Sequence, residues 1–390
     1  MKEGLAEPFV VDIPEATLQD LRARLRRARL APDVDNESWR YGTNGDYLAG
    51  LLAYWADGFD WRAMERKINA LPQERVLLDG IPIHYVHQRS PEPGAMPIIL
   101  SHGWPWTFWD YHKVVGPLVD PVAHGGDARD AFHVVVPSLP GFGFSSPLRR
   151  SGVTWMDTAD LFARVMTQVL GYDRFAAFGG DWGSIVTGQL GHKYPEHVIG
   201  IHNGTSALDI WNIERPWDLW GEMYNQAPQA MRPALRAYQR RFSSHVSVQV
   251  LDPQTLAHAL HDSPAGLASW LVERRRTWSD CGGDVERRFT RDELLTHLTI
   301  YWATETLVTS VRYYAEAAAH PWTPSHDRTP RIEVPAGQSV FLSDTPTGQG
   351  PGRTPGVTFY REHERGGHFA PAEEPEAVVK DIREMFRPLR

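Results

Sequence analysis

The chain has 390 residues, more than one typical domain, and its 42% apolar and 23% charged residues exclude a disordered, collagen-like or coiled-coil protein. Its single cysteine, Cys281, excludes an internal disulfide framework and a cysteine-rich zinc site. Because 40 basic residues stand against 48 acidic ones, the net charge is −8, and the whole-chain basic footprint of a nucleic-acid-binding protein is absent.

The N-terminal part of the chain predicts a partly helical extension, to which we assign residues 1–74. Leucines recur at helical spacing between arginines over residues 11–30, which predicts a helix with a solvated basic face. Residues 31–75 are rich in Trp, Tyr and Asp, and we expect one more helix near Tyr47–Trp55. No apolar run approaches the ~20 residues that span a bilayer, and no secretory signal is visible, so we expect a cytoplasmic protein without a membrane anchor.

From residue 75 the pattern changes to short strands. Arg75–Leu78 and Ile81–His87 flank Asp79-Gly80, a strong hairpin signal. Short apolar runs typical of strands buried on both faces follow at Pro97–Leu100, His133–Val136, Phe175–Phe178 and Val198–Ile201. The helix-like stretches are Thr158–Leu170 and Ser184–Tyr194. This alternation predicts the α/β class, with a mostly parallel sheet flanked by helices.

A helical block interrupts this α/β pattern. Strand signals stop between about Leu208 and His320, and helical periodicity replaces them, as in Leu294–Ala318. The pattern then resumes with strands at Ser339–Leu342 and Gly356–Tyr360 and a closing helix at Pro375–Phe386. We therefore predict a core of residues 75–207 and 326–390 and a helical cap of residues 208–325. The cap is expected over the carboxyl ends of the strands, where open α/β sheets bind ligands.

The segment Phe175–Gly183, FAAFGGDWG, carries the first chemical signal. It fits G-x-Nu-x-G between a strand and a helix, which is the nucleophile elbow of α/β-hydrolases, with Asp181 at the nucleophile position. The alternative is a glycine-rich turn in which Asp181 caps the helix. A carboxylate nucleophile attacks a saturated carbon and forms an alkyl ester.

An oxyanion hole is predicted next to this elbow. His102-Gly103-Trp104-Pro105 follows the strand Pro97–Leu100 directly, where an α/β-hydrolase places its oxyanion loop. The expected donors are the backbone N–H groups of Trp104 and Trp182. We expect the bond before Pro105 to be cis.

A general base and its carboxylate partner are predicted late in the chain. His368 follows two glycines after the last strand, and Asp344 follows the strand before it. The order Asp181, Asp344, His368 is the hydrolase order of nucleophile, acid and base. His368 would activate the water that attacks the ester carbonyl of Asp181. Rival acid residues are Asp209, Glu362 and Glu364.

The leaving group separates two chemistries. A departing halide needs N–H donors such as indoles, whereas an epoxide oxygen needs a proton, which a tyrosine supplies. The predicted cap contains Tyr314 in the sequence VRYYAE, and Tyr238 and Tyr301 elsewhere. The alternative for Tyr314 is an amphipathic side chain that lines a helix interface.

The chain resembles the microsomal and juvenile-hormone epoxide hydrolases over nearly its whole length. The matching blocks are EPFVVDIPEATLQDLRARL, HGWPWTFWDY, SLPGFGFSSP, GGDWG, HDSPAGLASWLVER, YWATET, RYYAE and RGGHFAPAEEPE. The resemblance implies an α/β-hydrolase fold with an N-terminal extension. It implies Asp181 as the nucleophile, His368 as the base and Asp344 as its partner. It also implies that Tyr314 is one of two lid tyrosines that polarise the epoxide.

The sequence departs from this family at three points. The microsomal members carry a membrane anchor, which we do not expect in this chain, and the acid partner is often Glu where this chain has Asp344. The position of the second lid tyrosine matches His245, and Tyr238 lies seven residues upstream. A weaker resemblance is to soluble bacterial members that act on aryl epoxides in enediyne antibiotic pathways.

The leading prediction is an epoxide hydrolase that makes a vicinal diol from an aryl or bulky apolar epoxide and water, with no metal and no cofactor. Aromatic residues near the expected pocket motivate the substrate class: Trp104, Trp106, Trp109, Trp182 and Phe144. We predict substrate contacts from Tyr238, His245, Trp109 and Phe144. The alternatives are a haloalkane dehalogenase with the same nucleophile and a non-catalytic ligand-binding protein on this fold. Homo-oligomerisation stays open, and no nucleic-acid partner is expected.

Overall fold

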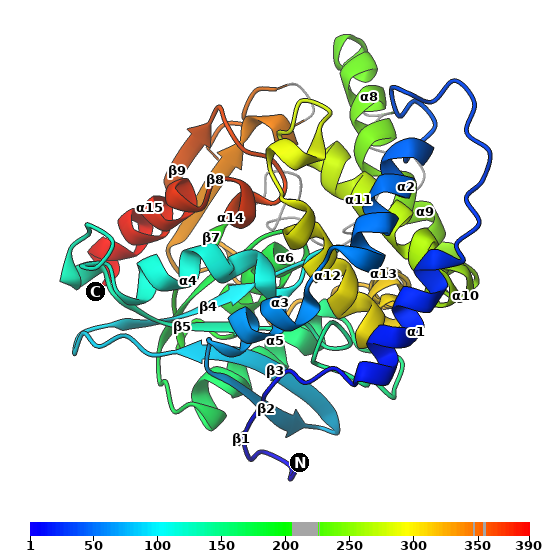
Figure 1. Cartoon of the computed structure of the whole chain (residues 1–390). Coiled ribbons are helices and arrows are strands. Elements are labelled where there is room, and N and C mark those ends of the chain that lie inside the picture. The colour runs from blue at the N-terminus through cyan, green and yellow to red at the C-terminus, as the bar shows by residue number, and fades with distance from the viewer. Residues whose placement is uncertain (205–224, 226, 346–347, 354–355) are drawn as a thin grey trace.

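The computed structural model describes residues 1–204, 225, 227–345, 348–353 and 356–390 (Figure 1). In this part of the chain, nine strands form one sheet in the order β1-β2-β3-β5-β4-β6-β7-β8-β9. The strands are β1 (Glu7–Pro8), β2 (Gln73–Leu78), β3 (Ile81–Gln88), β4 (Met96–Ser101), β5 (Phe132–Pro137), β6 (Phe175–Gly179), β7 (Val198–Asn203), β8 (Ala336–Phe341) and β9 (Val357–His363). Strands β1, β2, β3 and β5 pair antiparallel, and the rest pair parallel. The predicted α/β class with a mostly parallel sheet is confirmed.

Local sequence rules account for these strands. The β2–β3 hairpin turns at Asp79-Gly80, whose φ angles of 52° and 73° are both in the left-handed region that this turn requires. Every residue of β6 is buried, as expected for a strand covered on both faces. The parallel strands end at one edge of the sheet, where the residues that follow β4, β6 and β8 meet.

Four helices pack on the two faces of the sheet (Figure 1). They are α4 (His112–Val119), α5 (Trp155–Arg164), α6 (Trp182–Lys193) and α15 (Pro375–Phe386), with α5 packed on α6 and α4 on α15. The predicted stretch Thr158–Leu170 begins as α5 and ends as one turn of π-helix over Val165–Val169. Helix α4 was not expected from the sequence, because Gly116 and Pro117 interrupt its eight residues.

The first 74 residues contain three helices, α1 (Glu15–Arg26), α2 (Gly45–Asp57) and α3 (Trp61–Asn69). The expectation of a single helix between residues 31 and 75 was therefore wrong. The Asp60 side chain accepts from Ala63 N and starts α3, which buries Trp61, Met64 and Ile68. This part of the chain contacts both the sheet and the cap, since β1 pairs with β2 while α1 and α2 pack on the cap helix α11.

The described part of the predicted cap is helical and lies between β7 and β8. Its helices are α8 (Arg232–Phe242), α9 (Ser244–Leu251), α10 (Pro253–Asp262), α11 (Pro264–Trp278), α12 (Arg291–Ala303) and α13 (Leu307–Ala319). Residues 208–224 and 226 of the predicted cap lie outside the described residues. The helical stretch Leu294–Ala318 is divided between α12 and α13, because the chain turns at Glu305 with a φ of 57°.

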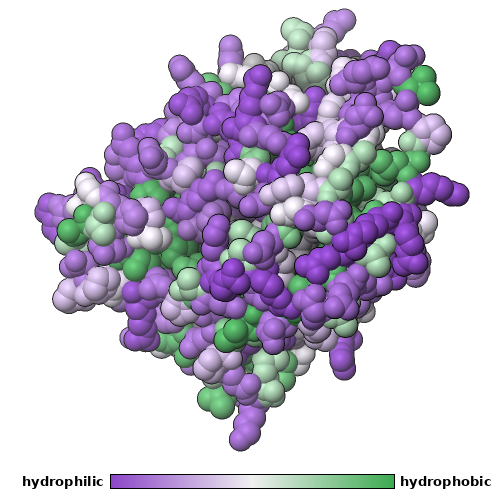
Figure 2. All heavy atoms as spheres, viewed as in Figure 1, coloured by the Kyte–Doolittle hydropathy of each residue, from purple (hydrophilic) through white to green (hydrophobic). Residues whose placement is uncertain are grey.

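Figure 2 shows the distribution of apolar residues on one face of the molecule. On the face shown in Figure 2, hydrophilic residues predominate and apolar residues occur in scattered groups. Among the residues that the structure describes, no helix combines the length and apolarity that crossing a membrane requires.

Candidate active site

The predicted nucleophile Asp181 lies between β6 and α6 in a strained backbone conformation, with φ 53° and ψ −127°. The glycines on either side are sterically required. A Cβ atom on Gly179 would lie 2.0 Å from the Gly183 carbonyl oxygen, and one on Gly183 would lie 1.9 Å from the Ser101 carbonyl oxygen. The Asp181 side chain does not cap α6, which argues against the alternative of a simple helix cap.

The loop after β4 lies directly against this carboxylate. The backbone N–H of Trp104 donates to Asp181 Oδ1 at 2.8 Å, and the Trp104–Pro105 bond is cis, as expected. A Cβ atom on Gly103 would lie 2.2 Å from the same oxygen, so only glycine leaves room there. Trp182 is the first residue of α6, where backbone N–H groups have no partner within the helix. These two amides are the expected oxyanion donors.

His102 fixes the loop after β4 through two hydrogen bonds. Its Nε2 atom accepts from Leu139 N at 3.1 Å, and its Nδ1 atom lies 2.9 Å from the Gly103 carbonyl oxygen. Burial lowers the pKa of His102 to about 4, so the ring is neutral at pH 7. Since Nε2 accepts, Nδ1 carries the proton and donates to Gly103.

His368 lies between two carboxylates. Its Nε2 atom is 3.2 Å from Asp181 Oδ2, and its Nδ1 atom is 3.2 Å from Asp344 Oδ1. The three residues come from the end of β6, the turn after β8 and the loop after β9. The rival acids do not share this position: Glu362 and Glu364 are exposed, and Asp209 lies outside the described residues.

The charges of this group depend on one another. Burial by itself lowers the pKa of His368, but Asp344 and Asp181 together raise it to about 10. Burial raises the pKa of Asp344, and the charge of His368 opposes that rise. The resting site therefore holds an imidazolium between two carboxylates, in the geometry of a nucleophile, a base and the base's orienting acid.

A tyrosine and a histidine from the cap face this group. The Tyr314 hydroxyl on α13 lies 3.2 Å from His245 Nε2 on α9, and both side chains are buried. Burial and the charge of Asp181 raise the pKa of Tyr314 well above 10, so it is a neutral phenol. Burial and the charge of Arg274 lower the pKa of His245 well below 6.5, so it is a neutral imidazole. The Trp104 ring stacks on His245 with 5.1 Å between centroids.

Comparisons with known proteins show which family the chain belongs to. A family model described as the epoxide hydrolase N terminus matches residues 6–111, and one described as the alpha/beta hydrolase fold matches residues 96–342. Epoxide hydrolase 1 of Sus scrofa is 32% identical over 402 residues, which cover 97% of this chain and 88% of the pig protein. The chain belongs to the epoxide hydrolase family. It is an enzyme that hydrolyses epoxides.

Two further relatives extend the similarity over the whole chain of this epoxide hydrolase. A Stigmatella aurantiaca protein named as a candidate epoxide hydrolase is 37% identical over 386 residues, which cover 98% of this chain and 85% of that protein. The crystal structure of juvenile hormone epoxide hydrolase from the silkworm Bombyx mori superposes with a TM-score of 0.79 at 25% identity. That superposition covers 99% of this chain and 94% of the silkworm chain.

The two candidates for the second lid position occupy different places. His245 contacts Tyr314, whereas the Tyr238 ring stacks on Phe242 with 4.4 Å between centroids. Phe242 in turn lies 6.4 Å from the His368 ring. Tyr238 lies near enough to the site for the charges of Asp344 and Asp181 to add to burial in raising its pKa well above 10.

Trp109 and Phe144, for which we predict substrate contact, lie in an aromatic cluster around Phe108. Phe144 packs against Phe9, His84 and Phe108, and Trp109 stacks on His112 at 4.4 Å. The reason is local, because Thr107 caps a short 3-10 helix over Phe108–Tyr111. Trp106 does reach the site, with its ring 5.7 Å from that of His368.

Arg275, whose side chain supports two loops of the site, was not identified from the sequence. It is buried in α11 and binds both oxygens of Asp110, at 2.6 and 2.9 Å. It also donates to the Pro105 carbonyl oxygen and lies over the Phe369 ring, 4.0 Å from its centroid. Burial opposes the ionisation of Asp110, but Arg275 lowers the pKa of Asp110 to about 2. One arginine of the cap thus supports the loops that carry Trp104 and His368.

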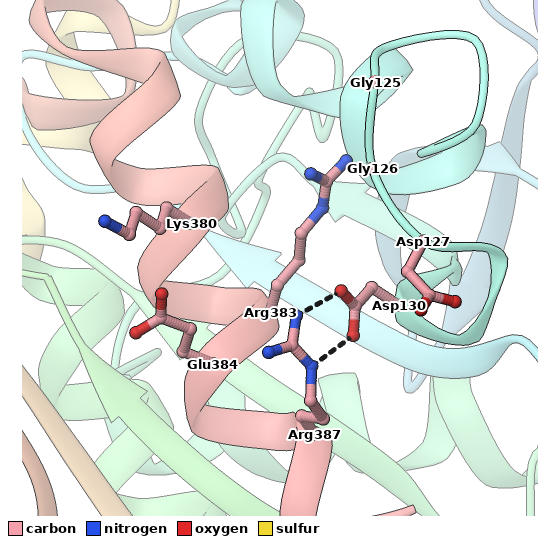
Figure 3. Close-up of a pocket in the computed structure, with 8 residues that line it drawn as sticks. All are labelled: Gly125, Gly126, Asp127, Asp130, Lys380, Arg383, Glu384 and Arg387. Carbon is pink, nitrogen blue, oxygen red and sulfur yellow. Dashed lines mark hydrogen bonds and ion pairs between the residues drawn. The ribbon is translucent and has the colours of Figure 1, made fainter.

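A surface cavity of about 500 Å³ lies elsewhere, between the loop before β5 and α15 (Figure 3). Its opposite charges lie side by side, and Arg387 pairs with Asp130 at 2.5 Å. None of the catalytic candidates lines it. Within the described ranges, no group of three His, Cys, Asp or Glu side chains is arranged to hold a metal ion.

Proposed function

We propose that this enzyme converts an aryl or bulky apolar epoxide to a vicinal diol through an ester on Asp181. The observation that carries this proposal is the different surroundings of the two Asp181 oxygens. Oδ1 accepts the Trp104 N–H at 2.8 Å, and Oδ2 lies 3.2 Å from His368. In such an arrangement one oxygen attacks while the other already lies in the oxyanion hole.

In the first step Asp181 Oδ2 attacks a ring carbon, and the bond between that carbon and the epoxide oxygen breaks. The oxygen takes a proton from the Tyr314 hydroxyl. The neutral state of Tyr314 and its 3.2 Å contact with His245 support this role. We propose that His245 stands where relatives use a second tyrosine, and that it keeps the Tyr314 hydroxyl oriented toward the ring oxygen.

The second step follows from the charge that the first step removes. Once Asp181 is an ester, its negative charge no longer supports the imidazolium, so the pKa of His368 falls below its resting value of about 10. The proton that His368 then gives up returns to the Tyr314 phenolate, and the neutral ring, oriented by Asp344, takes a proton from water. The hydroxide attacks Cγ of Asp181, and the N–H groups of Trp104 and Trp182 stabilise the oxyanion. The bond between Cγ and Oδ2 breaks, and the diol leaves with Oδ2 and the proton from His368. Asp181 keeps the oxygen of the water, and its carboxylic acid returns a proton to His368.

The proposed substrate class rests on the apolar walls of the site. Trp104 and Trp182 form part of these walls. Two more aromatic rings lie against His368, with centroid distances of 5.0 Å for Trp278 and 6.4 Å for Phe242. Aromatic walls favour a flat or bulky apolar substituent on the epoxide. We keep the division into an extension (1–74), a core (75–207 and 326–390) and a cap (208–325) as part of the proposal. A cytoplasmic location and a role in antibiotic biosynthesis stay predictions.

The test uses His368→Gln and styrene oxide, followed by intact mass measurement. The variant forms the ester but hydrolyses it slowly, so the protein gains the mass of the whole epoxide, mapped to Asp181 and absent in Asp181→Asn. A gain with styrene oxide but none with a small aliphatic epoxide supports the aromatic preference. No gain with any epoxide, together with an alkyl adduct from a chloroalkane, would contradict the proposal in favour of a dehalogenase.

A further inference from the structure

We propose that Glu373 is a positioning residue that ties the loop of the base His368 to the cap and thereby sets the rate of ester hydrolysis. The inference rests on the proposed function, since it concerns the second step of that reaction. Glu373 ends the short helix α14 (Ala370–Glu373), five residues after His368. In the described part of the chain its hydrogen bonds go to backbone N–H groups and not to Asp181, so it acts through the backbone that carries the base.

The Glu373 carboxylate joins two segments that lie about 90 residues apart in the chain. Its Oε1 atom accepts from the backbone N–H of Phe369, the residue after His368, at 2.9 Å. Its Oε2 atom accepts from the backbone N–H of Asp280, in the cap loop after α11, at 2.8 Å. One side chain thus satisfies a backbone donor on the base loop and another on the cap.

Other hydrogen bonds join the loop of His368 to the cap loop after α11. The His368 N–H donates to the Trp278 carbonyl oxygen at 3.0 Å, and the Gly366 N–H donates to Asp280 Oδ2 at 3.0 Å. A Cβ atom on Gly367 would lie 2.7 Å from the Trp278 carbonyl oxygen, so the loops are in close contact. The base loop is therefore fixed by the cap as well as by the sheet.

The chemistry of Glu373 argues for a specific role. It is buried and forms no ion pair with the described residues, whereas its neighbour Glu374 pairs with Arg288 at 2.7 Å. Burial raises the pKa of Glu373 to about 7, so holding this group inside the protein is costly. The Glu373 carboxylate supplies two acceptors for two buried backbone donors. An amide cannot replace it, because one N–H would then face an NH₂ group.

The position of His368 matters more for ester hydrolysis than for ring opening. Ring opening uses Asp181 and Tyr314, while ester hydrolysis needs His368 within reach of both water and Asp344. If Phe369 loses its acceptor, the base loop shifts against Asp344, to which His368 Nδ1 is held at only 3.2 Å. A defect at Glu373 therefore slows hydrolysis and leaves ester formation largely intact.

The experiment compares Glu373→Gln with Glu376→Gln, an exposed glutamate three residues further along, during turnover of styrene oxide. Acid-quenched samples give the fraction of enzyme present as the ester, and steady-state kinetics give kcat. We expect Glu373→Gln to lower kcat at least about tenfold and to accumulate the ester, while Glu376→Gln matches the wild type. Unchanged kcat without ester accumulation in Glu373→Gln would overturn the proposal. So would a fall in kcat with ester formation slowed as much as hydrolysis.

Two further variants keep the test decisive. Glu373→Asp retains the charge on a shorter side chain, so it is expected to accumulate less ester than the amide, and it serves as the test if Glu373→Gln does not fold. Equal hydrolysis rates in Glu373→Asp and the wild type would then contradict the proposal. His368→Gln separates this failure from that of the proposed function: if His368→Gln traps no ester from any epoxide, the mechanism itself is refuted and the role of Glu373 falls with it.

Discussion

Replacing Asp181 by Asn should lower the pKa of His368 and change how the stability of the protein depends on pH. In the wild type two carboxylates lie 3.2 Å from the imidazole nitrogens and, against the effect of burial, raise the pKa of His368 to about 10. Asparagine has nearly the same shape as aspartate but no charge. The substitution also mimics electrostatically the ester that forms during turnover, so the same measurement tests the proposed activation of the base.

The structure sets the size of the effect. At 3.2 Å and an effective dielectric constant of ~20, one carboxylate stabilises the imidazolium by about 5 kcal/mol. That energy corresponds to a pKa change of roughly four. Relaxation of the site reduces the change, so we expect the pKa of His368 to be lower by about two or more. A difference of two pH units corresponds to a stability difference of ~3 kcal/mol.

The sign of the pH dependence follows from the raised pKa. Because the folded pKa of His368, about 10, lies above the unfolded value of 6.5, its stabilisation is fully present below pH 6.5. It is lost as the pH rises toward about 10. In Asp181→Asn the loss ends at a lower pH, so the free energy of unfolding falls less between pH 6.5 and 10.

Urea unfolding of both proteins across this range measures the difference. Groups that do not interact with Asp181 contribute equally to both proteins and cancel in the comparison. His368→Gln serves as the control, since removing Asp181 in that background should leave the pH dependence unchanged. Parallel stability curves for the wild type and Asp181→Asn would refute the argument that Asp181 holds the proton on His368.

Three other predictions follow from the site. Tyr314→Phe should slow ester formation at least about a hundredfold in single-turnover experiments, because the ring oxygen loses its proton donor, while ester already formed hydrolyses normally. Arg275→Met leaves Asp110 buried without its partner and should cost ~3–5 kcal/mol in urea unfolding, whereas Arg276→Met, with a partly exposed side chain, should cost far less. Gly103→Ala should abolish ester formation in a folded protein seen by circular dichroism, because its Cβ atom would lie 2.2 Å from Asp181 Oδ1; normal alkylation would contradict the assigned position of the loop.

The sequence alone was enough for the features that depend on local rules. The positive φ of Asp181 and the narrow space around Gly179 and Gly183 follow from the elbow pattern, because side chains at those glycines would collide with backbone. The order of Asp181, Asp344 and His368 also followed from where short strands end. Such signals can be read from the sequence because a turn or a strand end involves residues that are neighbours in the chain.

Tertiary structure decided which of several equivalent residues reaches the site. Nothing in the run Arg274-Arg275-Arg276 marks the middle residue, yet it alone pairs with Asp110. Likewise Glu373 faces two backbone amides while the adjacent Glu374 pairs with Arg288.

The aromatic residues lead to the same conclusion. Trp106 reaches His368 and Trp109 does not, because the chain turns into a short helix after Thr107. His245 matched the second lid position in the sequence and Tyr238 was the alternative, and only the packing of α9 against α13 brings His245 to Tyr314. In each case the deciding contact joins segments far apart in the chain, and composition and periodicity carry no information about how two distant elements are oriented toward one another.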